Sequence, residues 1–467
     1  MSRGAGTLIR GAWVLSMASA EEAIRDGGVV IGADGGIDEV GDAAALLAAN
    51  PELDVVGDGH GIVLPGFVNA HTHLTESLIT GMGEDASLFE WFTRIINPAG
   101  GVITRDDMVI GTRLRAVEML RSGTTTVNDM SAYGNVGSLA ALGAVDGLAE
   151  LGMRAQVSYG AADNFPGGPA VEDVMAEHEA LADRIDGEPL IGYRTGIATI
   201  LALSDELFKR TVSASVENGW AVHTHAAEVR EEVTQSRTQY GHGTIERAYG
   251  MGLFEVPVIA AHCVWCTPGD IGLMASKHAT AAHNPISNML LASGVMPLRE
   301  IRAAGIPVGL GTDGAASNDN QDMFGALKVA GLLHKVTALD ATALTAPEIV
   351  RMATIEGARA MGLADEIGSL EPGKRADVVL LDGNQPELVA MHDPFQVVVY
   401  CATARCVSDV WVDGERRLQD GELPGVDLPT IIGEARGAAI DLAQRAGLGA
   451  ESVYAGPGRL GETRSAG

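Results

Sequence analysis

Aromatic, basic and cysteine residues are all scarce in this 467-residue chain. Only 4% of the residues are aromatic, and four are Cys. Four cysteines in a chain this long do not indicate the disulfide scaffold of a small secreted protein. The 32 Lys and Arg residues stand against 61 Asp and Glu, which leaves a formal net charge of −29. Such a surface repels phosphate backbones and anionic membranes, so neither nucleic acid nor membrane partners are expected.

Long hydrophobic runs are missing as well. No uninterrupted apolar stretch reaches the roughly 18 residues of a membrane-spanning helix. Residues 1–17 contain no apolar core that ends in a cleavage site, so they do not read as a signal peptide. We therefore expect a cytoplasmic protein. Its 46% of hydrophobic residues suffice for a large core in a chain longer than one typical domain.

Both ends of the chain are typical of short β-strands. Apolar residues alternate and are interrupted by Gly and Asp in TLIRGAWVLSM, GVVIGADGGIDEVG and GIVLPGF, and similar segments return as ADVVLLDG, VVVYCAT and VSDVWVDGERRL. Alternation of this kind predicts strands joined by turns. We therefore predict a small composite β-sandwich formed by residues 1–64 and 366–426, with a C-terminal helix and tail at 427–467.

The middle of the chain, residues 65–365, alternates apolar strands with segments of helical periodicity. Eight strand candidates occur in order, namely VLPGFVNAH, TTTVNDM, RAQVSYG, LIGYRTG, WAVHTH, VIAAHC, ATAAHNP and VGLGTD. Eight such strand–helix units over about 300 residues are typical of a parallel barrel. The predicted fold class is α/β, a (β/α)8 TIM barrel that carries the composite β-sandwich.

Polar residues collect where the predicted barrel strands end. Catalytic groups of a (β/α)8 barrel lie at the carboxyl ends of its strands. Half of the chain's 12 histidines fall at such ends, and they are His71, His73, His223, His225, His262 and His283. The eighth strand ends in Asp313. This placement predicts that the barrel mouth holds an active site.

The spacing of these residues predicts a metal centre. His71 and His73 are two apart on an extended segment, so both side chains project from one side of the strand. His225 and Asp313 can complete a site of three imidazoles and one carboxylate. Such a set suits Zn(II), with Fe(II) as the alternative. We predict one divalent metal per chain, which would lower the pKa of a bound water and so make hydroxide available.

Three residues near this centre are expected to be catalytic. Glu228 follows His225 by three positions and would turn back over the metal if a helical turn began there, which makes it the candidate proton shuttle. His262 lies on the next strand and can hydrogen-bond the attacking water or the developing anion. Asp313 can accept the water proton as well as bind the metal.

Several motifs together resemble one known family. PGFVNAHTHL, HTHAAE, AAHC, HNPISN, GTDGAASND and LEPGKRADVVLLD are similar to the aminohydrolase branch of the amidohydrolase superfamily, which includes S-adenosylhomocysteine and methylthioadenosine deaminases and the s-triazine hydrolases. The resemblance covers nearly the whole chain and implies the same metal ligands and proton carriers. Relatives with two metals have a bridging Lys at the end of strand four. LIGYRTGIATI has none, which favours a mononuclear site.

The resemblance also implies substrate-binding positions. It assigns a ribose contact to Glu84, and Trp91 can form an aromatic wall beside it. Arg194, His283 and Ser317 are expected to face the substrate from other strand ends. Adenosine-type deaminases carry a purine-binding His after strand four, and the stretch Arg194–Ala198 lacks it. Weak turnover of adenosine, methylthioadenosine and S-adenosylhomocysteine, relative to another aminated ring, is therefore predicted.

The most favoured function is hydrolytic deamination of an amino-substituted N-heterocycle of purine, pterin, pyrimidine or triazine type. A second hypothesis is a hydrolase that displaces chloride or an alkylamine from a triazine-like ring, or opens a cyclic imidate. A third is a binding protein without catalysis, and the intact metal ligands and Glu228 count against it. The expected partner is a small heterocyclic molecule. The resemblance implies a homo-oligomer.

Overall fold

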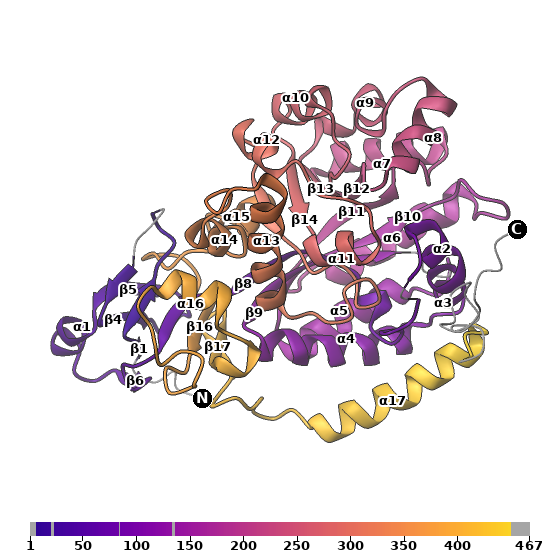
Figure 1. Cartoon of the computed structure of the whole chain (residues 1–467). Helices are drawn as coiled ribbons and strands as arrows, with labels where there is room; N and C mark the ends of the chain where they lie inside the picture. The colour runs from indigo at the N-terminus through magenta and orange to yellow at the C-terminus, as the bar shows by residue number, and fades with distance from the viewer. Residues whose placement is uncertain (1–5, 20–22, 84, 133–135, 450–467) are drawn as a thin grey trace, which may run out of the picture.

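The computed structural model describes residues 6–19, 23–83, 85–132 and 136–449. Figure 1 shows a helix-covered barrel on one side and, beside it, smaller sheets built from the indigo start and the orange end of the chain. No helix among the described residues combines the length and apolarity of a membrane-spanning segment. The predicted fold class is confirmed.

Eight parallel strands form the barrel, in the order in which they occur in the chain. They are β8 (Phe67–Thr72), β9 (Thr124–Ala132), β10 (Arg154–Ala161), β11 (Ile191–Thr199), β12 (Val222–Ala226), β13 (Val258–His262), β14 (Thr280–His283) and β15 (Val308–Leu310). Just after β15, the Asp313 N–H donates to the His71 carbonyl at 2.9 Å. This hydrogen bond joins the last strand to the first, so all eight predicted strands meet at one barrel mouth.

Helices cover the outside of the barrel. They are α4 (Arg105–Arg121), α5 (Ala140–Leu151), α6 (Val171–Ile185), α7 (Asp205–Asn218), α8 (Arg230–Tyr240), α9 (Thr244–Gly250), α10 (Pro268–Ser276), α11 (Pro285–Leu290), α12 (Leu298–Ala303), α13 (Met323–Ala338), α14 (Ala346–Met352) and α15 (Ile355–Ala360). α4 shows how their ends are set. The Thr104 side chain accepts the Asp107 N–H at its start, and Gly123 follows its end with φ +82°.

Two further sheets draw on both chain ends. A four-stranded sheet has the order β5 (Ile37–Asp42), β4 (Gly27–Ile31), β1 (Thr7–Arg10) and β6 (Asp54–Val56). A six-stranded sheet has the order β18 (Glu415–Leu418), β17 (Val407–Val412), β16 (Val378–Leu381), β7 (Ile62–Pro65), β2 (Trp13–Leu15) and β3 (Ala23–Arg25). Because β16 pairs antiparallel with β7, the start and end of the chain share one sheet, as predicted.

The segment VLPGFVNAH, predicted as one strand, is two. β7 belongs to the six-stranded sheet, β8 begins the barrel, and Gly66 separates them. A Cβ at Gly66 would lie 2.2 Å from the Thr125 side chain. Only glycine therefore lets the chain pass from one sheet into the other at this point.

Shorter helices and the C-terminal helix complete the chain. They are α1 (Ala43–Ala49), the 3-10 turns η1 (Leu74–Glu76), η3 (Leu253–Glu255) and η4 (Ala404–Cys406), α2 (Leu88–Trp91), the π-helix η2 (Phe92–Ile96), α3 (Asn97–Gly100), α16 (Pro394–Tyr400) and α17 (Leu428–Arg445). Figure 1 shows α17 running beneath α4, where Arg445 pairs with Asp107 at 2.7 Å. The predicted tail from 450 lies outside the described residues.

Candidate metal centre and active site

The four predicted metal ligands converge at the barrel mouth. The Asp313 Oδ1 lies 3.2 Å from His71 Nε2 and 3.4 Å from His73 Nε2. His73 Nε2 and His225 Nε2 are 2.9 Å apart. Bonds of about 2.0–2.2 Å to one tetrahedral Zn(II) place neighbouring ligands roughly 3.3 Å apart. The separations therefore fit a single ion held between these side chains.

The outward-facing nitrogens of the ligand rings are held by neighbours. His71 Nδ1 bonds His223 Nε2 at 2.8 Å, and His73 Nδ1 donates to the Met130 carbonyl at 2.7 Å. Such contacts orient imidazoles toward a metal. His71 Nε2 is buried, faces the cluster and has no hydrogen-bond partner. Buried polar atoms normally have a partner, so this unpaired nitrogen fits the role of a metal ligand.

Burial favours the neutral form of His73 and His225. It lowers the pKa of His73 to about 4, helped by the charge of His71, and lowers the pKa of His225 well below its usual range. Burial opposes ionisation of Asp313, but the His71 imidazole 3.2 Å away outweighs it and holds the Asp313 pKa well below normal. Neutral imidazoles and an ionised carboxylate are the protonation states that bind a metal.

Two of the predicted catalytic residues have a backbone conformation that L-residues rarely adopt. His262 has φ +73° and Asp313 has φ +66°. Left-handed conformations at residues other than Gly cost about 1–3 kcal/mol and cluster at functional sites. At both positions the chain bends at the end of a barrel strand and turns its side chain toward the mouth.

Glu228 lies beside the cluster, although not on a helical turn. Ala227 has φ +50° and α8 begins only at Arg230, so Glu228 sits in the loop between β12 and α8. The expectation of a helical turn was wrong, because the left-handed Ala227 reverses the chain before any helix starts. The side chain is nonetheless 5% exposed, and Ser293 Oγ donates to its Oε1 at 3.3 Å.

His262 lies between the two acids predicted to move protons. Its Nε2 is 3.6 Å from Glu228 Oε2 and 3.8 Å from Asp313 Oδ2. Its Nδ1 accepts the Asn288 side-chain N–H at 2.8 Å, so Nε2 is the nitrogen that faces the cluster. Burial lowers the pKa of His262 to about 3. The ligand atoms of His71, His225, His262 and Asp313 all lie within 4.8 Å of one another, so His262 reaches the same centre as the predicted ligands.

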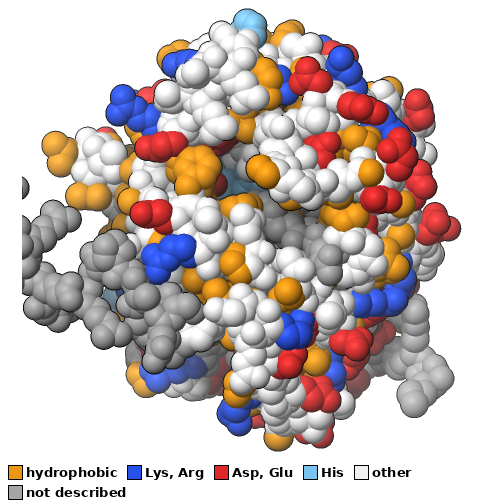
Figure 2. Space-filling view, turned by 90° about the vertical axis from the view of Figure 1, so that its right-hand side faces the viewer, with side chains coloured by type: hydrophobic (Ala, Val, Ile, Leu, Met, Phe, Trp, Pro, Cys, Tyr) orange, Lys and Arg blue, Asp and Glu red, His pale blue; other side chains and the backbone are white. Residues whose placement is uncertain are grey.

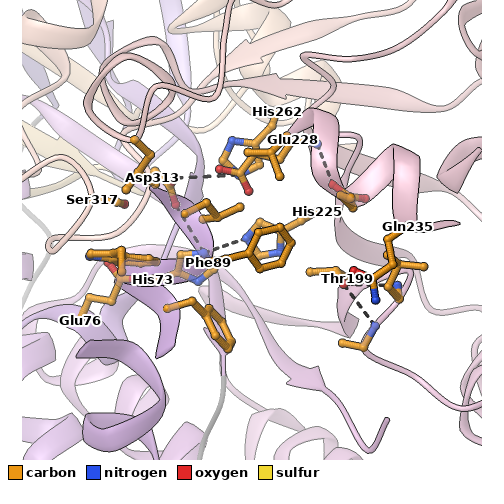
Figure 3. A pocket seen from close by; sticks show the side chains of 18 residues that line it. His73, Glu76, Phe89, Thr199, His225, Glu228, Gln235, His262, Asp313 and Ser317 are labelled. Atoms are coloured by element: carbon orange, nitrogen blue, oxygen red, sulfur yellow. Dashed lines mark hydrogen bonds and ion pairs between the residues drawn. The ribbon is translucent and has the colours of Figure 1, made fainter. Parts of the chain in front are cut away.

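A cavity of about 250 Å³ opens onto this centre. Figure 2 shows the hollow in the surface, with histidine visible inside and hydrophobic side chains around it. Figure 3 shows Phe89 in front of the predicted metal ligands, with Glu76 and Glu228 on either side of the Asp313–His73 pair. Two of the predicted substrate contacts, Trp91 and Ser317, line the cavity. Trp91 is anchored there because its Nε1 donates to the Ala316 carbonyl at 3.0 Å.

Two other predicted substrate contacts, Arg194 and His283, do not line this cavity. Arg194 is buried in β11 and donates to the Met361 carbonyl, so its guanidinium is directed away from the mouth. His283 is buried and pairs with His334 of α13 at 3.0 Å between their Nε2 atoms. Thr199, at the end of β11, lines the cavity instead. Glu84 lies outside the described residues.

Glu76 lines the cavity and was missed by the sequence analysis. It is 3% exposed, and its Oε2 accepts the Ala316 N–H at 3.0 Å. Burial, then the charge of Asp313, raises its pKa well above the usual range. A signal was present, because Glu76 follows His73 by three residues just as Glu228 follows His225.

Other residues missed by the sequence analysis hold the catalytic groups. Ser287 Oγ donates to Asp313 Oδ2 at 2.6 Å, and Asn288 holds His262. Glu232 accepts the backbone N–H groups of both Ala227 and Glu228, at 3.1 and 2.8 Å. Ser287 and Asn288 thus hold the polar groups of the site from behind.

The chain is similar to known proteins over almost its whole length. The Amidohydrolase family model matches residues 62–417. The chain belongs to the amidohydrolase family. It is 37% identical over 443 residues to the 5-methylthioadenosine/S-adenosylhomocysteine deaminase of Pelotomaculum thermopropionicum, covering 94% of this chain and 100% of that one. It is 35% identical over 453 residues to the 5'-deoxyadenosine deaminase of Methanosarcina mazei, covering 94% and 99%.

A solved structure extends the likeness to three dimensions. An adenosine deaminase from Xanthomonas campestris with bound zinc superposes on this amidohydrolase with a TM-score of 0.87 and 31% identity, covering 94% of this chain and 99% of that one. The predicted superfamily is confirmed, and so is the predicted enzyme class, a hydrolase acting on C–N bonds other than peptide bonds. The coarse function, metal-dependent deamination of an N-heterocycle, has the same support.

Proposed function

We propose that this amidohydrolase removes ammonia from an aminated N-heterocycle, using one divalent metal held by His71, His73, His225 and Asp313. The observation that carries the proposal is the convergence of three imidazoles and one carboxylate on a single point at the floor of a cavity. Zn(II) is the first choice, because it favours nitrogen ligands in tetrahedral geometry and is bound by the Xanthomonas relative. Fe(II) is the alternative.

The chain's own residues supply the proton chemistry. A bound metal of this kind makes hydroxide available near neutral pH. Glu228 takes a proton at Oε2, beside His262, and delivers it to the leaving nitrogen of the substrate. His262 donates a hydrogen bond from Nε2 to the oxygen that attacks or to the charge that develops on it. Asp313 Oδ2 lies near His262 Nε2. It accepts a hydrogen bond from the Ser287 hydroxyl, which keeps the carboxylate oriented.

The walls of the cavity indicate a flat ring. Phe89 and Trp91 provide aromatic surfaces, while Glu76, Thr199 and Ser317 provide hydrogen-bonding groups at its edges. We take a 5'-substituted adenosine as the first substrate to test, because the relatives at 35–37% identity are deaminases of such molecules. The competing prediction, weak turnover of adenosine-type rings, follows from the missing purine-binding His after strand four. Thr199, at the end of β11, lines the cavity after that strand.

Ammonia release from the zinc-loaded enzyme tests the proposal. The panel contains adenosine, 5'-deoxyadenosine, methylthioadenosine, guanine, a pterin, cytosine and melamine, together with a chloro-triazine whose chloride release is followed separately. The proposal is supported by a kcat/KM of about 10⁴ M⁻¹s⁻¹ or more for at least one aminated ring. Chloride release without ammonia release from any ring would favour the alternative, displacement from a triazine.

We also propose a cellular location and an oligomeric state for the protein. A cytoplasmic location fits four cysteines that are all unpaired in the structure. Homo-oligomeric assembly rests on the family resemblance alone. Sedimentation of the purified chain measures its mass in solution, and a monomer at micromolar concentration would contradict the second proposal.

A further inference from the structure

The cavity over the candidate metal centre is called the metal pocket below. A second cavity adjoins it on the same face of the barrel. Its volume is about 760 Å³, and it is lined by the residues at and after the end of β10 and by η2 and α3. Phe92 and Ala202 line both cavities, so the two are neighbours with a shared wall. A substrate whose ring lies over the metal can therefore extend its substituent into the second cavity.

The lining of the second cavity is neutral. Among the described residues that form it, none is Lys, Arg, Asp or Glu. Phe92, Tyr159 and Phe165 contribute aromatic surface, and Asn97 and Asn164 contribute amide groups. Burial raises the pKa of Tyr159, so its phenol stays uncharged. A charged group that entered this cavity would lose its hydration without meeting an opposite charge.

Two features indicate that this neutral wall is built to receive a ligand. Phe165 is 53% exposed at the cavity, so its ring is accessible to a bound apolar group. Phe92 begins a π-helix of five residues between α2 and α3, and such segments are frequent at functional sites. Phe92 is also one of the two residues that line both cavities.

We propose that the second cavity binds the 5' substituent of an adenosine-type substrate and selects a neutral, apolar one. The methylthio group of methylthioadenosine has this character. The homocysteine end of S-adenosylhomocysteine does not, because it carries an ammonium and a carboxylate. This inference rests on the proposed deaminase function and separates two substrates that share a single name among the relatives.

The test is the ratio of kcat/KM for methylthioadenosine to kcat/KM for S-adenosylhomocysteine, measured by ammonia release with the zinc-loaded full-length enzyme. The two substrates share one ring, so the ratio reports the substituent and not the metal site. We expect a ratio of at least tenfold, with 5'-deoxyadenosine on the side of methylthioadenosine.

A charged variant makes the test specific to the cavity. Phe165→Arg places a cation on the half-exposed rim and should lower the ratio several-fold by giving the substrate carboxylate a partner. Leu339→Arg is the matched control, because Leu339 is 91% exposed at the end of α13 and does not line either cavity. It should leave the ratio unchanged.

The outcomes separate this inference from the function beneath it. S-adenosylhomocysteine turned over as well as methylthioadenosine, or better, overturns the inference and leaves the deaminase function standing. Deamination of another ring with no turnover of either nucleoside does the same. An unchanged ratio in Phe165→Arg counts against the cavity as the selecting element. No ammonia from any ring removes the proposed function, and the inference with it.

Discussion

The Glu232 carboxylate accepts the backbone N–H of Glu228 at 2.8 Å and that of Ala227 at 3.1 Å. One acid of α8 thus holds the loop on which the proposed proton carrier stands. Glu232 is itself buried, and burial raises its pKa against the opposing hydrogen bond from Glu228. A buried carboxylate whose two oxygens both accept backbone N–H groups indicates that the position of this loop matters to the site.

Removal of Glu232 should therefore lower turnover without removing the metal. In Glu232→Leu the two N–H groups lose their acceptor, and kcat should fall about 10-fold or more as Glu228 loses its position. Glu232→Gln keeps one acceptor oxygen and should recover much of the loss. The measurements are kcat, KM and zinc content. A fall in zinc content equal to the fall in kcat would show that Glu232 supports the fold and not the proton carrier.

Glu228→Gln should keep the fold and the metal but lose roughly 10²–10⁴-fold in kcat, the usual scale for a general acid–base group. The amide preserves the shape of the side chain and cannot carry the proton. Glu231→Gln is the control, because Glu231 is an exposed acid in the first turn of α8. Steady-state kinetics decide the point, and normal turnover in Glu228→Gln would mean that another group moves the proton.

The purified protein should hold about one zinc or iron per chain. Chelation should abolish ammonia release, and added Zn(II) should restore it, because His71 Nε2, which faces the cluster, has no hydrogen-bond partner in the protein. His225→Ala should weaken metal retention without unfolding the barrel. Elemental analysis measures the stoichiometry. Two tightly held metals per chain would contradict the mononuclear site.

Stability should fall in acid because His178 is buried as a neutral imidazole. Burial lowers the pKa of His178 to about 4, against about 6.5 in the unfolded chain. The unfolded state therefore binds more protons between these values, so the stability from this group is complete above pH 6.5 and is lost as the pH falls. The loss from pH 7.5 to pH 5 should be about 2 kcal/mol.

Urea unfolding of the wild type and of His178→Gln at both pH values isolates this contribution. The variant keeps a side chain that can bond the Tyr193 hydroxyl, which lies 3.0 Å from His178 Nδ1, but it does not titrate. It should lose less stability on acidification than the wild type does, while any acid-driven loss of metal affects both proteins alike. Equal losses would mean that His178 is protonated in the folded state.

Much of the fold was predictable because barrel strands carry local signals. Each of the eight predicted segments contains a barrel strand, since short apolar runs alternated with helical periodicity. The segment VVVYCAT, expected as a strand, instead forms the end of helix α16 and the residues after it. The error of division at Gly66 arose because two strands of different sheets follow each other with a single residue between them. Nothing in the alternation of side chains marks that change of partner. It depends on the Thr125 side chain that crowds Gly66 in the folded chain.

The candidate site divides in the same way. His71, His73, His225 and Asp313 were predictable from sequence because parallel strands deliver their last residues to one barrel mouth whatever the loops do. Arg194 and His283 met the same criterion of strand position and yet lie away from the cavity. For them, the partners Met361 and His334 come from distant segments whose packing no local pattern records.

The sequence by itself determined the barrel, the composite sheet and the candidate metal ligands, because short apolar runs mark the strands and the ends of parallel strands meet at one barrel mouth. Only the tertiary structure decided which polar groups support them, how Glu228 reaches the cluster from a loop, and that a neutral second cavity adjoins the metal pocket. Glu76 and Ser287 gain their roles from partners in distant segments of the chain. Contacts of that kind are set by how the chain packs, after the strands have formed.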